Sequence, residues 1–385
     1  MSIIAAELKL YKSATANDTN SNGGRLSAVE VDTGIKNNLF PDVTETQRLA
    51  GIVQYRKAFW KVAHSDYNLG IDYAQTFLKS RTPGDDIIYL FAGTQTGRQE
   101  DISSPDLFGV APLETSVTTA DNDAVVTLDA DEVIYRIGDN CYLTDGTNSE
   151  IKELTNVVKV GTTVTLTFDG VFSYNFSSTN TVIASVLELT DECVFDLSDV
   201  TDVDGVYNMP LQWPYLILDA IGCIYQTWTI VVAEGGSTFS CTGDTLGEID
   251  AAQSVAANYA PVNPDFLKPY FTILASNWTG LSGTMTFKTK PAAAPVWFKR
   301  DVPISSAAQP TNTCDVTLEG EVVDVRTLYT TTTTSTTTSS TTSSSSTTSS
   351  SSTTSSSSTT SSTMSTTSTT SSTMSTTSTT TTTAP

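Results

Sequence analysis

The sequence predicts a mainly β protein made of β-sandwich or barrel domains, with an inserted small β module and few short helices. Short segments rich in Val, Ile, Thr and aromatic residues recur along the chain between Asp, Asn, Gly and Pro turns, which is the pattern of β-strands. Helix signals are sparse. From Thr330 to Pro385 nearly every residue is Thr or Ser, so about 330 residues remain to fold, enough for roughly two or three domains.

The first segment, residues 1–21, begins with alternating apolar residues around Ile3–Leu10 and then becomes polar. Such alternation is typical of a strand with one buried face. We expect either a peripheral strand or an N-terminal arm that reaches a neighbouring subunit.

Residues 22–112 are expected to form the first part of a β-rich main domain. A turn is predicted at Asn22–Gly24, because two glycines allow positive φ without steric cost. Asp42–Glu45 has capping-box spacing, with the Asp42 carboxylate as the cap, and Gly51 ends the short helix that follows. A Pro-Gly turn at Thr82–Asp86 leads into an apolar strand at Ile87–Ala92.

A strand is also predicted from Ile52 onwards, and both of its faces mix apolar and cationic side chains. One face carries Tyr55, Lys57, Phe59 and Lys61, and the other carries Gln54, Arg56, Ala58 and Trp60. One interpretation is a strand whose Lys and Arg stems lie along apolar neighbours. The other is a subunit contact, in which the cations meet the acidic surface of a neighbouring copy.

Residues 113–190 are interpreted as an inserted small barrel or sandwich module, because longer strands resume after them. Its predicted strands are Ala124–Leu128, Val133–Arg136, Cys141–Thr144, Ile151–Val160, Thr163–Phe168 and Thr181–Leu189. Residues 191–329 then form the second part of the main domain. The strands expected there are Cys193–Leu197, Tyr215–Asp219, Ile224–Ala233, Tyr270–Ala275, Thr284–Lys288, Val296–Arg300 and Cys314–Val325. Four tryptophans place the main core in this half: Trp213, Trp228, Trp278 and Trp297.

The tail, residues 330–385, has almost no apolar side chains to offset the loss of chain entropy on folding. We therefore expect a disordered, hydroxyl-rich tail. The alternative is that replication slippage produced this end of the chain and the protein tolerates it, in which case the tail has no role of its own.

The net charge of −22 argues against direct nucleic-acid binding, because phosphates would be repelled. The five cysteines are Cys141, Cys193, Cys223, Cys241 and Cys314. They are widely spaced, with no CxxC or Cys/His cluster, so a zinc site is not expected. Buried free thiols are the simplest interpretation, although Cys223 and Cys241 could pair across a hairpin.

No catalytic, cofactor-binding or metal-binding residue can be assigned. His64, the only histidine, lies in a polar segment that predicts a strand-end turn, and a triad would have to use it. Asp196, Asp199, Asp202 and Asp204 precede Gly205 with spacing that fails the EF-hand pattern. They are interpreted as a loop of solvated acids, with calcium binding by Asp199, Asp202 and Asp204 as the alternative.

The N-terminus has no signal-peptide pattern, and no apolar run approaches the length of a membrane span. We expect synthesis in the cytoplasm without membrane insertion.

Several short segments, in this order, resemble a family of tailed-bacteriophage and prophage virion structural proteins. In this chain they are Asn22–Arg25, Asn37–Val43, Thr46–Gly51, Tyr55–Phe59, Thr82–Asp86, Asn263–Phe271 and Pro291–Arg300. The resemblance covers most of residues 20–325 and consists of turn and strand signatures. It implies a particle component without active-site residues.

The resemblance and the composition together predict a non-enzymatic tail, neck or baseplate component that acts by self-assembly. Its expected partners are copies of itself in a symmetric oligomer and other virion proteins, with host surface glycans as a further candidate. It would be made in the bacterial host cytoplasm and reside in the virion. The alternatives are a capsid decoration protein, or a carbohydrate-binding or adhesive surface protein with a Ser/Thr-rich stalk. An enzyme on a β scaffold is less favoured.

Overall fold

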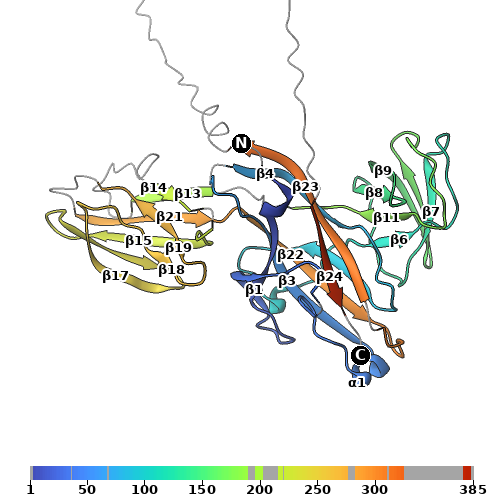
Figure 1. Ribbon diagram of the computed structural model, residues 1–385, viewed down its shortest axis with the longest axis horizontal. Helices are drawn as coiled ribbons and strands as arrows, with labels where there is room; N and C mark the ends of the chain where they lie inside the picture. Colours follow the sequence, from blue (N-terminus) through green and yellow to red (C-terminus); the bar gives the residue numbers. More distant parts are fainter. Residues whose placement is uncertain are drawn as a thin grey trace, which may run out of the picture.

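The computed structural model describes residues 3–35, 37–66, 69–189, 196–202, 216–219, 221–275, 282–309, 312–324 and 376–382. Strands dominate, as predicted, and they form a central part with one lobe on each side (Figure 1). No helix within these residues has the length and hydrophobicity that crossing a bilayer requires.

The central part contains two antiparallel sheets. The first has the strand order β2-β1-β3-β22-β5 and the second has the order β12-β4-β23-β24. The strands of the first sheet are β1 (Leu8–Thr15), β2 (Gly23–Glu30), β3 (Ile52–Val62), β5 (Ile87–Ala92) and β22 (Ala293–Val302). The second consists of β4 (Leu69–Leu78), β12 (Leu187–Glu188), β23 (Asn312–Asp324) and β24 (Thr376–Thr382).

The longest pairing in the first sheet joins strands that are far apart in the sequence. β22 runs antiparallel to β3, in register from Ala293 opposite Lys61 to Val302 opposite Ile52. Both strands have neighbours on either side, so they form the middle of the sheet. The predicted strands from Ile52 and at Val296–Arg300 are confirmed.

The N-terminal segment is an integral strand. β1 lies between β2 and β3, with Leu8 paired to Val62 and Lys12 to Ala58. Ile3, Leu8 and Leu10 are buried in the main core. The interpretation as an arm to a neighbouring subunit is therefore wrong, because this chain itself buries the alternating apolar face.

One of the lobes is a six-stranded sheet of order β6-β11-β8-β9-β10-β7 (the right side of Figure 1). A bridge between Leu113 and Val126 connects its two ends, which curves the sheet towards a barrel. Its strands are β6 (Val110–Pro112), β7 (Asp123–Thr127), β8 (Asn140–Thr144), β9 (Ser149–Val160), β10 (Thr163–Phe168) and β11 (Val182–Ser185). The predicted strand at Val133–Arg136 is wrong: that segment is a loop. We call this part the barrel lobe.

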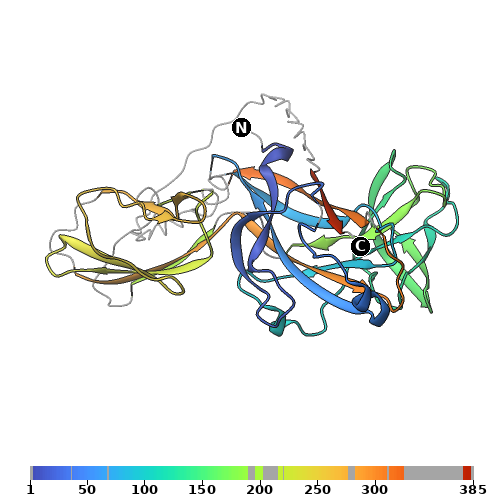
Figure 2. The same ribbon diagram turned by 60° about the horizontal axis from the view of Figure 1, so that its bottom comes forward.

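The other lobe contains a five-stranded sheet of order β13-β21-β15-β16-β17 and two short pairs, β14-β20 and β18-β19. These strands contribute to neither central sheet, and Figure 2 shows them as a separate layer. They are β13 (Asp196–Asp202), β14 (Leu216–Leu218), β15 (Gln226–Val232), β16 (Thr238–Gly243), β17 (Gly247–Ser254), β18 (Val262–Asn263), β19 (Lys268–Pro269), β20 (Phe271–Ile273) and β21 (Gly283–Lys290). We call it the sheet lobe. The hairpin β16–β17 was not predicted.

The hydrophobic cores cross the lobe boundaries. One cluster of buried side chains extends from the central sheets into the sheet lobe, from Leu8 and Trp60 to Trp228 and Phe287. A second fills the barrel lobe and includes Tyr89 and Trp297 of the central sheet. Of the later tryptophans, Trp228 lies in the main core, as predicted, whereas Trp297 is buried in the second cluster; Trp213 and Trp278 lie outside the described residues.

Within the residues that the structure describes, helical structure is limited to α1 (Glu45–Ala50) and two single turns, η1 (Ala5–Glu7) and η2 (Gln99–Asp101). The cap of α1 is Thr44 and not Asp42, because the Thr44 hydroxyl accepts from the Gln47 amide and the Gln47 side chain accepts from the Thr44 amide. Gly51 follows the helix with φ 74°, as predicted.

Of the Ser/Thr-rich tail, the structure describes only Thr376–Thr382, which pair as β24 with β23. The expected disorder of the tail otherwise falls on residues outside the described part of the chain.

A hydrogen-bond chain joins the two central sheets through the core. The indole N–H of Trp60 in β3 donates to the Thr76 hydroxyl in β4 at 3.0 Å, and that hydroxyl donates to the Thr317 carbonyl in β23 at 2.8 Å. All three residues are fully buried. Each polar group is satisfied by the next, as burial requires.

Replacing Thr76 with Val keeps the side-chain volume but removes the buried hydroxyl that accepts from the Trp60 indole N–H and donates to the Thr317 carbonyl. We expect a loss of about 1–3 kcal/mol in the free energy of unfolding, measured by urea denaturation. The exposed Thr163→Val in β10 is the control and should change stability by less than about 0.5 kcal/mol. Equal effects of the two substitutions would contradict the role of this chain of hydrogen bonds.

Candidate functional site: the buried cations of the central sheet

Every buried Lys or Arg in the described part of the chain lies on β3 or β22. Arg56, Lys57 and Lys61 come from β3, and Lys299 and Arg300 come from β22; each is at most 9% exposed. An ammonium or guanidinium group removed from water needs hydrogen-bond partners, because its desolvation otherwise costs several kcal/mol. The partners that these side chains find determine how the rest of the chain is held.

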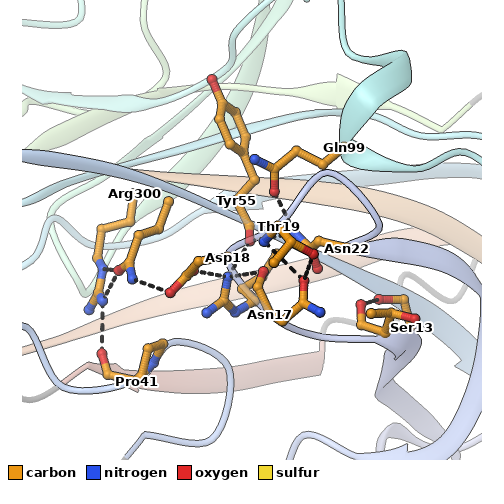
Figure 3. Close-up of polar contacts among 12 residues, drawn as sticks. Ser13, Asn17, Asp18, Thr19, Asn22, Pro41, Tyr55, Gln99 and Arg300 are labelled. Carbon is orange, nitrogen blue, oxygen red and sulfur yellow. Dashed lines mark hydrogen bonds and ion pairs between the residues drawn. The ribbon is translucent and has the colours of Figure 1, made fainter.

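Figure 3 shows the first group of contacts, centred on Asp18. Arg56 donates from Nη1 to Asp18 Oδ1 at 2.7 Å and to the Asn17 carbonyl at 2.9 Å. The Gln54 amide donates to Asp18 Oδ2 at 3.2 Å and accepts from Arg300 Nε at 3.1 Å. The Asp18 carboxylate, on the loop that follows β1, thus binds two side chains of β3, and Gln54 connects it to Arg300 of β22.

Arg300, on the neighbouring strand β22, completes this group of contacts. Its Nη2 donates to the Pro41 carbonyl at 2.8 Å, and both Arg300 and Arg56 lie over the Phe40 ring, at 4.8 and 5.6 Å. Burial lowers the pKa of Arg300 to about 10, opposed mainly by the charge of Asp86, so the guanidinium stays charged at neutral pH. These contacts fix the loop before α1 against the sheet.

Lys57 joins two glycine-containing loops. Its ammonium donates to the Gly24 carbonyl at 2.7 Å and to the Gly97 carbonyl at 3.0 Å, beneath the Trp297 ring. Gly23 has φ 105°, and a Cβ there would lie 2.8 Å from the Gly97 oxygen. Only glycine fits this close approach. Gly23 and Gly24 have the predicted positive φ, but they open β2, and the turn itself lies one step earlier, at Thr19–Asn22.

Lys61 connects the central sheet to the sheet lobe. Its ammonium is fully buried, donates to the Ile221 carbonyl at 2.9 Å and lies 4.8 Å from the Phe266 ring centre. Burial lowers the pKa of Lys61 to about 8. Arg25 of β2 adds hydrogen bonds to the Tyr225 carbonyl and the Gln226 side chain of the same lobe.

Lys299 makes the corresponding connection to the barrel lobe. Its ammonium pairs with Glu132 Oε1 at 2.8 Å, in the loop between β7 and β8. It also lies over the Tyr89 ring, at 5.1 Å. Next to it, Trp297 stacks on Phe91 with ring centres 5.9 Å apart, and both rings belong to the barrel-lobe core.

These contacts decide between the two interpretations of the cationic strand. Arg56, Lys57 and Lys61 are buried against rings of their own chain, so the interpretation with stems along apolar neighbours is confirmed. The interpretation as a subunit contact is wrong for these residues, because their charged ends already bind loops and a lobe of the same chain.

Of the other residues considered from the sequence, Cys223 lies close enough to Lys61 for its thiol to interact with the ammonium electrostatically. His64 is buried, accepts from the Asp66 amide through Nδ1 and lies 3.8 Å from Glu7.

Four of the cysteines are buried free thiols: Cys141, Cys223, Cys241 and Cys314. The predicted state is therefore confirmed for them, and the alternative of a Cys223–Cys241 disulfide is wrong. Burial raises the pKa of the Cys223 and Cys314 thiols to about 12, which makes them poor nucleophiles. Cys193 is outside the described residues.

The predicted acidic loop is corrected in part. Asp196–Asp202 form β13, paired with β21, instead of a loop. Asp204 lies outside the described residues. Within the described residues, no group of three or more His, Cys, Asp or Glu side chains is arranged to hold a metal ion.

A cleft of about 340 Å³ lies where the Thr82–Asp86 turn meets Pro303–Ser306. Arg81 forms an ion pair with Asp129 there, and Asp85 accepts from the Ala307 amide at 2.7 Å. Burial raises the pKa of Asp86, opposed by the charge of Arg300. The charged side chains that line the cleft are therefore largely paired with other groups of the same chain.

The lowered pKa of the buried Lys61 ammonium should be visible in the pH dependence of the protein's stability. Between pH 8 and its ordinary pKa of 10.5, Lys61 is largely neutral in the native state but protonated in the unfolded state. The unfolded state then binds more protons, so this residue makes stability rise with pH, by up to about 1.4 kcal/mol per pH unit.

We therefore expect the free energy of unfolding of the wild type, relative to Lys61→Met, to increase from pH 7.5 to 9.5. Urea titrations at several pH values measure it. Lys159→Met, which removes a half-exposed surface ion pair with Asp131, is the control and should show no such slope relative to wild type. Parallel curves for wild type and Lys61→Met would contradict the assignment.

Lys299→Met should loosen the barrel lobe. Spin labels at Leu49→Cys in α1 and Val160→Cys in β9 report the distance between the central part and this lobe. Both positions are exposed, Cys193 is replaced by Ser in every variant, and the four buried native thiols should stay unlabelled. We expect a broader distance distribution in Lys299→Met than in wild type, and no broadening in Lys159→Met, whose ion pair lies within the lobe. An unchanged distribution in Lys299→Met would show that apolar packing alone fixes the lobe.

Comparisons with known proteins do not place the chain in a family. No family model matches it, and no curated protein matches it. Among solved structures, VP17, a capsid protein of bacteriophage P23-77, aligns with a TM-score of 0.12 at 11% identity, over 65% of this chain and 87% of that one. A score this low does not indicate a shared fold.

Proposed function

We propose that this protein is a non-enzymatic structural component of a tailed-bacteriophage particle, in the tail, neck or baseplate, and that it acts by self-assembly. The observation that carries the proposal is that two central strands bind both lobes through Lys61 and Lys299. Three β units are thereby held in a fixed relation, as a subunit that keeps its place in a particle requires.

The segments that resemble virion proteins support this proposal through their positions. Tyr55–Phe59 lie in β3, and Pro291–Arg300 lead into and occupy most of β22. Asn22–Arg25 and Asn37–Val43 supply the carbonyls bound by Lys57 and Arg300. Segments that are scattered in the sequence thus converge on the buried cations, so the pattern corresponds to one physical arrangement.

Charge supports association with other proteins over nucleic acid. The chain has 42 Asp and Glu against 20 Lys and Arg, and five of these cations are buried. The outer surface is therefore more acidic than the composition alone implies. Partners with basic surfaces would be attracted, and phosphate backbones would be repelled.

The test is the composition of purified particles. Quantitative mass spectrometry should find the chain at many copies per particle, in a number that matches a symmetric ring. A reconstruction of particles that carry a tagged chain would give its position and separate tail, neck and baseplate from capsid decoration. Absence from particles, together with secretion and retention on glycans, would replace the proposal with the adhesive alternative.

A further inference from the structure

We propose that β24 is an exchangeable strand: the tail of one copy pairs with the β23 edge of another copy and links the two chains. This inference goes beyond the proposed function and does not depend on it, because it concerns the association of the purified chain.

The first argument is the edge that β24 covers. β23 pairs with β4 on one side and with β24 on the other, in register from Asn312 opposite Thr382 to Leu318 opposite Thr376 (Figure 1). Cys314, Val316 and Leu318 of this stretch are buried in the main core. Without β24, a strand at the margin of that core would present unpaired N–H and C=O groups, which is a template for pairing with another strand.

The second argument is connectivity. β23 ends at Asp324 and β24 begins at Thr376, so residues 325–375 separate two strands that a hairpin would join with about two to five residues. A segment of this length can span at most ~170 Å when fully extended. The length of this segment therefore permits β24 to pair with a neighbouring copy as well as with its own chain.

The third argument is the repetition of the donor sequence. Residues 361–370 and 371–380 are identical, SSTMSTTSTT, and the first five residues of β24, TTSTT, occur three times in each tail, at residues 333–337, 366–370 and 376–380. Each chain thus presents one acceptor edge and three matching donor sequences, an excess that permits one tail to connect copies.

Mass action then decides which chain is the donor. Pairing within a chain is favoured by an effective concentration that falls as the connecting segment lengthens. Where copies are crowded, as in a ring of subunits, the local concentration of other tails competes with it. Exchange should therefore increase with protein concentration.

A native cysteine makes the register testable. Cys314 lies directly opposite Thr380, and facing residues in antiparallel strands are close enough for a disulfide. A tagged donor carrying Cys314→Ala and Thr380→Cys is mixed with untagged wild-type acceptor and oxidised with glutathione disulfide. The donor cannot form this bond within its own chain, so a disulfide between position 380 and Cys314 must join two chains.

We expect a mixed dimer on non-reducing gels, identified by mass spectrometry of the linked peptides. Its yield should rise about tenfold for a tenfold increase in acceptor concentration below saturation. A donor with Cys314→Ala and Thr379→Cys, whose new thiol faces Asp315 instead, is the matched control and should give little product. Ser378→Pro added to the first donor removes a backbone donor within β24 and should reduce the yield without touching the folded core.

Two results would overturn the inference. If the single variant Thr380→Cys forms only an intramolecular bond at every concentration and the mixture gives no dimer, β24 stays with its own chain. If neither sample forms a bond at position 380, β24 does not cover this edge. Both results leave the virion proposal intact, because particle composition tests that proposal separately.

Discussion

The hydrogen bonds of the buried cations on β3 and β22 are the constraint on which the rest of the structure depends. A strand in the middle of a sheet covered on both faces would ordinarily be apolar, yet these two carry five charged groups with at most 9% exposure. Each charge must find a carbonyl or carboxylate, since leaving it unpaired would cost several kcal/mol. The loops at Asn17, Gly24, Pro41 and Gly97 and the lobe contacts at Ile221 and Glu132 are those partners.

Two buried tryptophans also have their N–H groups satisfied by hydrogen bonds inside the protein. In the central sheets, Trp60 donates to Thr76, which donates to a strand carbonyl. In the sheet lobe, Trp228 donates to Thr289 at 2.9 Å, and Thr289 donates to the Ile224 carbonyl at 2.8 Å. Each aromatic residue gains a large buried area while its N–H is satisfied through one hydroxyl. Polar groups inside this protein therefore specify which strands lie together, while apolar area supplies most of the stabilisation.

Much of the fold could be predicted from the sequence, because strands and turns depend on local patterns. The strands around Tyr55, Ile87, Thr163 and Trp297 were found by composition and alternation, and Gly51 by its position after a helix. The cap of α1 was misplaced because Asp42 and Thr44 both satisfy cap chemistry, and only the backbone direction decides between them. β16 and β17 were missed because Thr238–Ser254 has few apolar residues to alternate.

The site was half predictable: the cations of β3 stood out, but their partners Asp18, Pro41 and Ile221 are chosen by three-dimensional proximity, which no spacing encodes. The Lys-Arg pair within the apolar run that ends at Arg300 was the available signal for the second strand.

The pairing of β3 with β22 also orders the events of synthesis. Lys61 meets Ala293 and Ile52 meets Val302, so the long flank of β3 has no partner until nearly the whole folded region has left the ribosome. The strands of the barrel lobe are contiguous in sequence and can form beforehand, since local contacts form faster than distant ones. Until β22 has been synthesised, the positive charges of Arg56, Lys57 and Lys61 interrupt an otherwise aggregation-prone strand. The residues that later bind the loops of the central part and the sheet lobe therefore first protect the nascent chain from pairing with the wrong strand.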